Sequence, residues 1–290
     1  MAAVEEDSTK ISAKQKSDYY LVDSHCHLHD RGAYNYAFSH QQIGKKLLRK
    51  YPDLPHEPTD FTPEKLISRA HGADVKKMIC VGTSPEDSMV ARDFATKYQQ
   101  DGLFWSYGIH PDEAMMDTKI DLSSLDGGPV AIGEVGLDYR DGESNRKNQL
   151  RLLEQMVQLA VDRDLPLIFH VREAFSDFFA VVDNFPTARG VVHSFSDSPE
   201  NLKKALNHNF YIGVNGLVTF APEIPVLAIP FDKLLLETDA PFLTPNPFRG
   251  TINESAHIKD ICAYISKING VTEAEIAKVT TENAERLFKI

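Results

Sequence analysis

Histidines and carboxylates recur in this chain of 290 residues directly after short apolar runs. Two of the histidines follow the first run, and one histidine or acid follows each of four later runs. The resulting candidate metal ligands are His25, His27, Glu134, His170, His193 and Asp239. Imidazole and carboxylate groups hold the divalent cations of many hydrolases. A fold that gathered these residues would therefore form a hydrolytic metal centre.

The apolar runs alternate with amphipathic segments along the chain. Strands are expected at residues 19–24, 75–81, 103–109, 129–134, 166–170, 190–193, 210–214 and 233–237. The clearest helix is expected at 146–163, where Leu150, Leu153 and Val157 recur at helical spacing. This alternation predicts an α/β fold, a single (β/α)8 TIM barrel. Because the C-terminal ends of the strands in such a barrel meet on one face, the candidate ligands would converge there.

The barrel domain is expected to cover residues 18–290. Residues 1–17 carry mixed charge without the apolar core of a signal peptide, and we interpret them as a flexible leader. Residues 31–60, rich in Tyr, His and Pro, are long for a connection between a strand and a helix. We expect them to form a loop insertion on the face where the ligands meet.

Composition indicates a globular protein and disfavours a broad basic coat for nucleic acid. Hydrophobic residues at 42% and charged residues at 25% describe an ordinary globular protein. The net charge of −11 opposes a broad basic coat for nucleic acid, but not a nuclease. Two bound divalent ions would add about four positive charges at the site itself.

The cysteines and the hydropathy pattern bear on the compartment. The 3 cysteines are too few and too scattered for a disulfide framework or a thiolate zinc site, which indicates a reducing compartment. No segment reaches the roughly 18 apolar residues that a membrane-spanning helix needs. We expect a cytoplasmic monomer without membrane contact, or a nuclear protein if the source is eukaryotic.

The first histidine cluster is ambiguous by one pair. His25 and His27 are separated by one residue, and so are His27 and His29. Side chains two residues apart on a strand point to the same side, so either pair could bind one ion. We favour His25 and His27 because they lie nearer the apolar run. Cys26 would point the other way and pack.

The two acids are the candidate catalytic residues. Glu134 is flanked by Gly133 and Gly136, which permit close backbone approach. A carboxylate there could bridge two cations about 3.5 to 4 Å apart. Asp239 could bind a metal and also take a proton from the attacking water. Asp138 could orient a ligand at most.

Three residues are candidates for substrate contact, namely His110, Arg172 and Arg249. Arg172 follows His170 by two positions, so both would face one side, and a guanidinium beside a metal ligand suits a phosphate ester. An ion pair with Glu173 or Asp177 is an equally good interpretation. His110 ends the third strand, and Arg249 follows the eighth, near where barrels often bind phosphate.

As an ordered set, these motifs resemble the TatD-like family of metal-dependent deoxyribonucleases, a branch of the amidohydrolase-type metallo-barrels. The matching segments are residues 23–28, 108–111, 133–138, 170–174, 193–196 and 237–241. The resemblance implies that the six candidate ligands hold two divalent ions, Mg²⁺ in function or else Zn²⁺ or Mn²⁺. It also implies hydrolysis of DNA phosphodiesters by a metal-activated water, as a 3′–5′ exonuclease on single strands or 3′ ends.

One motif and three aromatic residues bear on the substrate. In the family the fourth histidine motif commonly reads His-Cys-Phe-Ser-Gly, whereas this chain has Ser194 and Asp197 there, and Asp197 is expected to add a carboxylate where small residues would admit a phosphate backbone. Tyr139, Phe195 and Phe242 could either stack on bases or pack in loops.

Three hypotheses remain at this point. The first is a metal-dependent phosphodiesterase, a hydrolase of ester bonds acting on DNA. The second is a metal-dependent amidohydrolase or esterase for a small molecule; many such relatives use a carboxylated lysine where this chain has Glu134 and no lysine nearby. The third is an inactive scaffold, which the intact ligand set disfavours because unpaired polar groups cost several kcal/mol when buried.

Overall fold

Eight parallel strands form a barrel in the computed structural model, which describes residues 19–116, 118–121 and 125–290. The strands are β1 (Leu21–Cys26), β2 (Val75–Val81), β3 (Leu103–Tyr107), β4 (Ala131–Asp138), β5 (Leu167–Arg172), β6 (Gly190–Val192), β7 (Tyr211–Val214) and β8 (Leu234–Leu236). They pair in chain order. A parallel bridge between Cys26 and Ala240 joins the two ends of the sheet. The predicted (β/α)8 barrel is confirmed.

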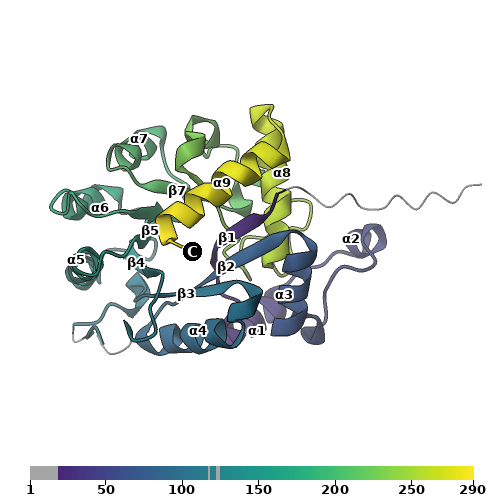
Figure 1. The fold of residues 1–290 in the computed structure, drawn as a ribbon, viewed down its shortest axis with the longest axis horizontal. Helices are drawn as coiled ribbons and strands as arrows, with labels where there is room; N and C mark the ends of the chain where they lie inside the picture. Colours follow the sequence, from purple (N-terminus) through teal and green to yellow (C-terminus); the bar gives the residue numbers. More distant parts are fainter. Residues whose placement is uncertain (1–18, 117, 122–124) are drawn as a thin grey trace, which may run out of the picture.

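Helices surround the strands (Figure 1). They are α1 (Arg31–His40), α2 (Lys45–Lys50), α3 (Pro63–Gly72), α4 (Pro85–Lys97), α5 (Arg146–Asp162), α6 (Phe175–Val182), α7 (Pro199–Asn207), α8 (Ile258–Asn269) and α9 (Glu273–Phe288). The helix expected at 146–163 is α5, and Leu153 and Val157 of its apolar stripe are fully buried. None of the described helices combines the length and hydrophobicity of a transmembrane segment.

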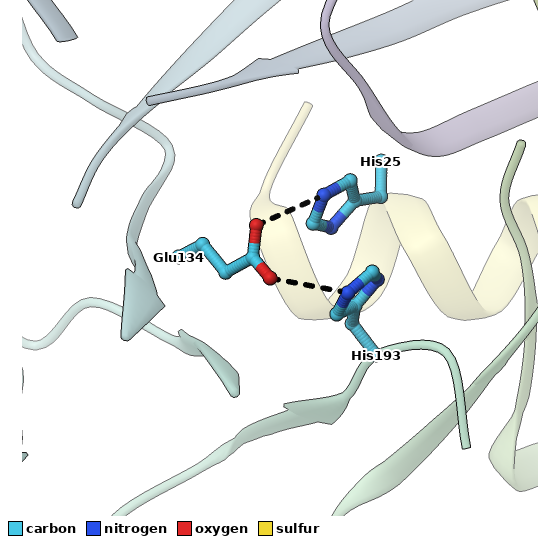
Figure 2. Close-up of side chains that lie close together, drawn as sticks. All are labelled: His25, Glu134 and His193. Carbon is cyan, nitrogen blue, oxygen red and sulfur yellow. Dashed lines mark ion pairs between the residues drawn. The ribbon is translucent and has the colours of Figure 1, made fainter. Parts of the chain in front are cut away.

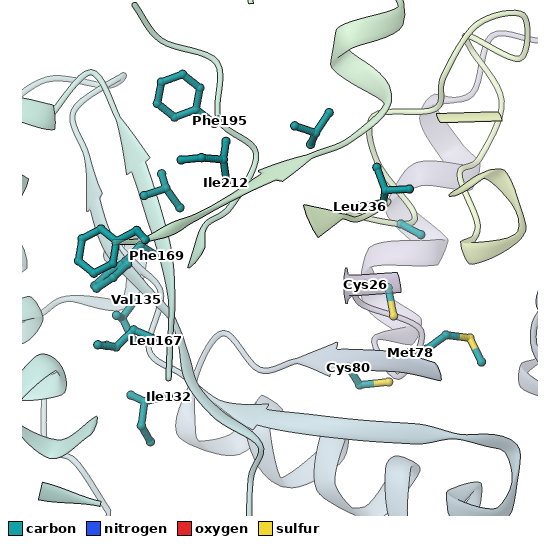
Figure 3. Close-up of a cluster of buried hydrophobic side chains, with 14 of the residues drawn as sticks. Cys26, Met78, Cys80, Ile132, Val135, Leu167, Phe169, Phe195, Ile212 and Leu236 are labelled. Atoms are coloured by element: carbon teal, nitrogen blue, oxygen red, sulfur yellow. The ribbon is translucent and has the colours of Figure 1, made fainter. Parts of the chain in front are cut away.

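Alternate strand residues enter two separate apolar clusters, as the period of two in an extended chain requires. Figure 3 shows part of the larger cluster, which includes Met78 and Cys80 of β2 and Phe169 of β5. The smaller cluster contains Ile168 and Leu235, and α9 closes it with Leu287 and Phe288. His170 and Glu237 follow Ile168 and Leu235 by two positions. His170 and Glu237 therefore lie on the same side of their strands as the residues of the smaller cluster.

The connection from β1 to α3 is more regular than the loop that we expected for residues 31–60. It contains α1, α2 and a 3-10 turn at Pro58–Phe61. Tyr34 of α1 is buried and its ring lies 6.1 Å from that of Phe61, which anchors the segment to the core. The leader expected at residues 1–17 lies outside the described residues.

Strand β4 differs from the expectation in a way that affects the site. It continues to Asp138, so Glu134 lies within the strand instead of at its end. The pairing with β5 shifts register between Ile132 and Val135. Glycine permits this close pairing, because a Cβ on Gly136 would lie 1.7 Å from the carbonyl oxygen of His170.

We predict that Gly136→Ala lowers the free energy of unfolding by about 3 kcal/mol, since the new methyl group would overlap the backbone of β5. Gly72→Ala is the matched control: its Cβ would meet nothing within 4 Å, and we expect a small gain in stability. Urea unfolding in chelator measures both without a contribution from bound metal. Equal stability of the two variants would contradict the proposed packing.

Candidate metal centre

The six candidate ligands meet around the carboxylate of Glu134. One oxygen, Oε2, lies 3.4 Å from Nε2 of His25. The other, Oε1, lies 2.6 Å from Nδ1 of His170 and 3.2 Å from Nε2 of His193. Figure 2 shows the two oxygens facing the rings of His25 and His193. A carboxylate with histidines at both oxygens has the arrangement of a bridging ligand.

The remaining two ligands lie beside His25. Oδ1 of Asp239 is 3.4 Å from Nε2 of His27 and 3.6 Å from Nε2 of His25. The two Nε2 atoms are themselves 3.2 Å apart. Residues at the end of β1, directly after β1 and in the loop after β8 thus form one group, and Glu134 connects it to His170 of β5 and to His193, directly after β6.

Three histidines have one ring nitrogen fixed by an outer partner. Nδ1 of His27 lies 3.0 Å from the carbonyl oxygen of Val81. Nε2 of His170 lies 3.0 Å from Oδ2 of Asp138. Such partners set the tautomer and orient the ring, and they leave the other nitrogen free for a cation. Asp138 is therefore located where its expected orienting role requires.

Glu237 provides the third outer partner, and our sequence analysis gave it no role. It is fully buried, and its Oε1 lies 3.2 Å from Nδ1 of His193. The same oxygen accepts a hydrogen bond from the backbone N–H of Ser194 at 2.6 Å. A signal was present in the sequence, because Glu237 follows Leu235 by two positions, so alternation along the strand directs both side chains to the same side.

The charges in the centre are strongly coupled. Burial alone would favour the neutral form of Glu134, but His193, His170 and His25 outweigh it and hold the pKa of this carboxyl well below its usual value. Burial and the neighbouring His193 lower the pKa of His25, which favours the neutral ring that a cation requires. The surroundings of both side chains therefore favour the protonation states of metal ligands.

The donor set fits divalent cations. Ligand atoms within 4.8 Å of one another form three groups, which are His25, Glu134 and His193; His25, His27 and Asp239; and His110, Glu134 and His170. All are imidazole nitrogens or carboxylate oxygens, which suit Zn²⁺, Mn²⁺ or Mg²⁺. Nδ1 of His27 can donate to Val81, so its Nε2 presents a lone pair toward the other ligands.

The structure places only one of the two possible histidine pairs beside Glu134 and Asp239. His29 is buried, and its Nε2 lies 3.2 Å from both carboxylate oxygens of Asp87. Burial opposes a charge on His29, but Asp87 raises its pKa to about 9. His25 and His27 are the pair that faces Glu134 and Asp239.

A pocket of about 980 Å³ opens onto the centre, and its lining includes His110 and Arg172. Nε2 of His110 lies 3.8 Å from Oε1 of Glu134. The guanidinium of Arg172 is exposed and forms no salt bridge or hydrogen bond with the residues that the structure describes. Asp177, its possible partner, is bound by Nε of Arg146 at 2.5 Å. Arg172 therefore remains available to a substrate.

Two expectations about substrate contact differ from the observed positions. Arg249 does not line the pocket, because its guanidinium stacks 3.5 Å above the ring of Phe220. Asp197 also lies outside the lining residues. Its Oδ1 accepts hydrogen bonds from the N–H of Ser198 and from Nδ2 of Asn201, both at 2.6 Å, at the start of α7. The Asp197 carboxylate therefore satisfies the helix start instead of facing a substrate.

The comparison with protein families agrees with the geometry. A family model described as TatD related DNase matches residues 22–289. The chain belongs to the TatD family. As a TatD protein with this ligand set, it is a metal-dependent hydrolase that acts on phosphodiester bonds.

Individual relatives cover most of the TatD chain. The uncharacterized metal-dependent hydrolase YabD of Bacillus subtilis is 35% identical over 255 residues, which are 84% of this chain and 99% of YabD. The 3′-5′ ssDNA/RNA exonuclease TatD of Cronobacter sakazakii is 32% identical over 79% of this chain and 92% of its own. The crystal structure of the TatD homologue YjjV from Escherichia coli matches with a TM-score of 0.76 and 26% identity, covering 93% of this chain and 98% of that one.

We predict that His25→Asn lowers metal retention and that His29→Gln leaves it unchanged. Loss of the His25 imidazole should reduce bound divalent metal at least about tenfold, since a coordinating nitrogen is removed. His29→Gln should keep the metal content of the wild type, because Nε2 of His29 lies 3.2 Å from both carboxylate oxygens of Asp87, and its ring centroid is 6.1 Å from that of His27. Elemental analysis after dialysis measures both, with melting temperatures as the control for folding. Full metal content in His25→Asn would contradict this ligand assignment.

Proposed function

We propose that this TatD protein is a deoxyribonuclease that removes nucleotides from the 3′ ends of single-stranded DNA. The family description and the name of the Cronobacter relative support nuclease activity on a single strand. The observation that carries the proposal is the Glu134 carboxylate, whose two oxygens face two sets of ligands in a pocket that Arg172 also lines. Paired cation sites with an adjacent arginine suit a phosphodiester.

The six ligands divide into two sets around Glu134 in this proposal. His25, His27 and Asp239 form one set, and His170 and His193 form the other. We propose two divalent ions, Mg²⁺ in function, with Zn²⁺ or Mn²⁺ as alternatives. When bound, these ions supply Lewis acidity that activates a water molecule and stabilises the negative charge that develops on phosphate oxygens.

The protein side chains orient the phosphodiester and move the proton. Arg172 would take two phosphate oxygens through its planar guanidinium. Asp239 would accept the proton of the attacking water, since surrounding histidines outweigh its burial and keep the pKa of this carboxyl below its usual value. Burial lowers the pKa of His110 to about 4, and its Nδ1 accepts a hydrogen bond from the N–H of Asp112, so the neutral ring can donate one hydrogen bond to the substrate through Nε2.

Pocket size supports a strand end as substrate. The volume of about 980 Å³ is that of a site for one drug-sized ligand. A few nucleotides of a single strand would fit this space, whereas the base pairs of a duplex are stacked beyond reach unless the end is opened. We therefore favour removal of terminal nucleotides over internal cleavage of double-stranded DNA.

We predict that metal-loaded protein shortens 3′-labelled and 5′-labelled single-stranded DNA in Mg²⁺ or Mn²⁺ and that a chelator abolishes the activity. A ladder from 5′-labelled DNA, with release of mononucleotide from the 3′ label, establishes the polarity. Glu134→Gln serves as the inactive control. Intact DNA in every reaction, together with turnover of a small amide or lactone, would refute the nuclease and support the alternative metal-dependent amidohydrolase or esterase.

Substitution of Arg172 tests the phosphate contact. Arg172→Ala should reduce kcat/KM for DNA about 10- to 100-fold, because a hydrogen bond to a charged group contributes roughly 1.5 to 3 kcal/mol. Arg172→Lys should recover only part of the loss, since a point charge lacks the planar fork. Arg249→Ala is the matched control, because that guanidinium stacks on Phe220 outside the pocket. Steady-state kinetics in which Arg172→Ala equals the wild type would remove Arg172 from the site.

A further inference from the structure

Two exposed aromatic rings face the same pocket from opposite ends of the sequence. Tyr36 of α1 is 59% exposed and Phe242, after β8, is 37% exposed, and both line the pocket. By contrast, Tyr139 and Phe195 are buried, at 9% and 2% exposure. The OH of Tyr139 donates a hydrogen bond to Asp177 and the ring of Phe195 packs on Phe175, so these two residues serve packing.

Backbone hydrogen bonds connect the segments that carry both exposed rings to the candidate metal ligands. The N–H of Asp30 donates to the carbonyl of His27 at 3.0 Å, and the Asp30 side chain then caps α1, which carries Tyr36. The N–H of Phe242 donates to the carbonyl of Asp239 at 2.9 Å. Side chains of His27 and Asp239 are 3.4 Å apart. The helix that carries Tyr36 and the loop that carries Phe242 thus begin beside neighbouring residues of the centre.

Helix α1 is oriented so that Tyr36 cannot enter the core. Tyr34 is buried, and Ala37 and Phe38, three and four positions later, pack against the same apolar cluster. This spacing defines the inner face of a helix and places Tyr36 outside it. The ring of Tyr36 stacks on that of His40, with centroids 4.1 Å apart, which supports one face of the tyrosine.

Further apolar residues connect the two rings into one surface. We call it the apolar wall, and it consists of Tyr36, Leu217, Ala221, Ile224, Phe242 and Leu243. Its segments contact one another: the N–H of Gln42 donates to the carbonyl of Gly250 at 2.7 Å, and a Cβ on Gly216 would lie 1.9 Å from the carbonyl oxygen of Leu243.

Both arginines of the lining belong to the other side of the pocket, together with the acids Asp112, Glu113 and Asp138, whereas Glu223 lies within the wall. The apolar wall belongs to connections after β1, β7 and β8, which are neighbours around the closed sheet. Arg172 ends β5 and Arg140 follows β4, on the opposite side of the barrel. A nucleotide has the complementary division, with an apolar aromatic base joined to an anionic phosphate.

We propose that the apolar wall is a nucleobase subsite, in which the terminal base of a single strand stacks on Tyr36 and Phe242. This inference rests on the proposed nuclease function and deepens it. Stacking of a base on an aromatic ring tolerates any sequence, since every base has a π face. It also requires an unpaired base, so the wall selects single strands or opened ends.

A fluorescent base tests the subsite directly. Oligonucleotides carry 2-aminopurine at the last or the second-last nucleotide and a phosphorothioate at the terminal linkage, and they are bound to full-length protein in Mg²⁺. We expect quenching of 2-aminopurine by wild type and by Tyr36→Phe, which keeps the ring. Tyr36→Leu combined with Phe242→Leu keeps apolar volume without rings and should lose the quenching. Unquenched fluorescence with wild type, or equal quenching with the double variant, would overturn the subsite.

Kinetics on natural single-stranded DNA provide the second measurement. The double variant should raise KM about 5- to 100-fold with little change in kcat, since stacking binds the substrate before and during the reaction alike. Leu227→Ala is the control, because Leu227 is 65% exposed and lies outside the pocket. Melting temperatures and metal content confirm that each variant folds. A KM equal to that of wild type in the double variant would contradict the proposal.

The two hypotheses fail in different ways. Ring-dependent quenching without hydrolysis of any DNA would refute the proposed nuclease and retain the base subsite. Hydrolysis of DNA without quenching, and with unchanged KM in the double variant, would retain the nuclease and refute the subsite.

Discussion

Closure of the barrel between β1 and β8 is made by the metal-ligand segments themselves. The N–H of Asp239 donates to the carbonyl of His25 at 2.9 Å, and the N–H of His27 donates to the carbonyl of Ala240 at 2.8 Å. The backbone bonds that end the sheet therefore also bring His25, His27 and Asp239 together. Assembly of this ligand group cannot be separated from folding of the barrel, and residues more than 200 positions apart depend on the same few hydrogen bonds.

Buried polar groups form hydrogen bonds next to this junction of β1 and β8. Asp23 is fully buried and accepts hydrogen bonds from the N–H and the hydroxyl of Thr238, at 2.9 and 2.6 Å. Burial raises the pKa of Asp23 to about 7, against the effect of these hydrogen bonds. Glu237 likewise contacts Nδ1 of His193 and accepts a hydrogen bond from the N–H of Ser194. Such a network is stable when its members are paired, and it fixes the direction of the ligands above it.

The candidate metal ligands and the proposed base subsite belong to different parts of the fold. Ligands such as Glu134 and His170 belong to strands, whose positions follow from sheet pairing. Tyr36 belongs to a helix inserted after β1, and Phe242 to the loop after β8. In barrels the connections vary more freely than the strands, so substrate preference can change while the metal centre stays intact. The segment 31–60 would act in this way here.

The sequence by itself determined the barrel and the order of its strands, and it supplied the candidate metal ligands. Apolar runs, and local motifs such as those that contain His25 or Asp239, are short-range properties of the chain. They can therefore be recognised without knowing which segments lie beside them in space. Only the tertiary structure decided which way individual side chains point. The side chain of His29 contacts Asp87, and that of Arg249 stacks on Phe220. Both partners come from other segments of the chain, so the sequence around His29 or Arg249 does not reveal them. Register shifts and long-range partners set side-chain direction, and neither can be read from one strand alone.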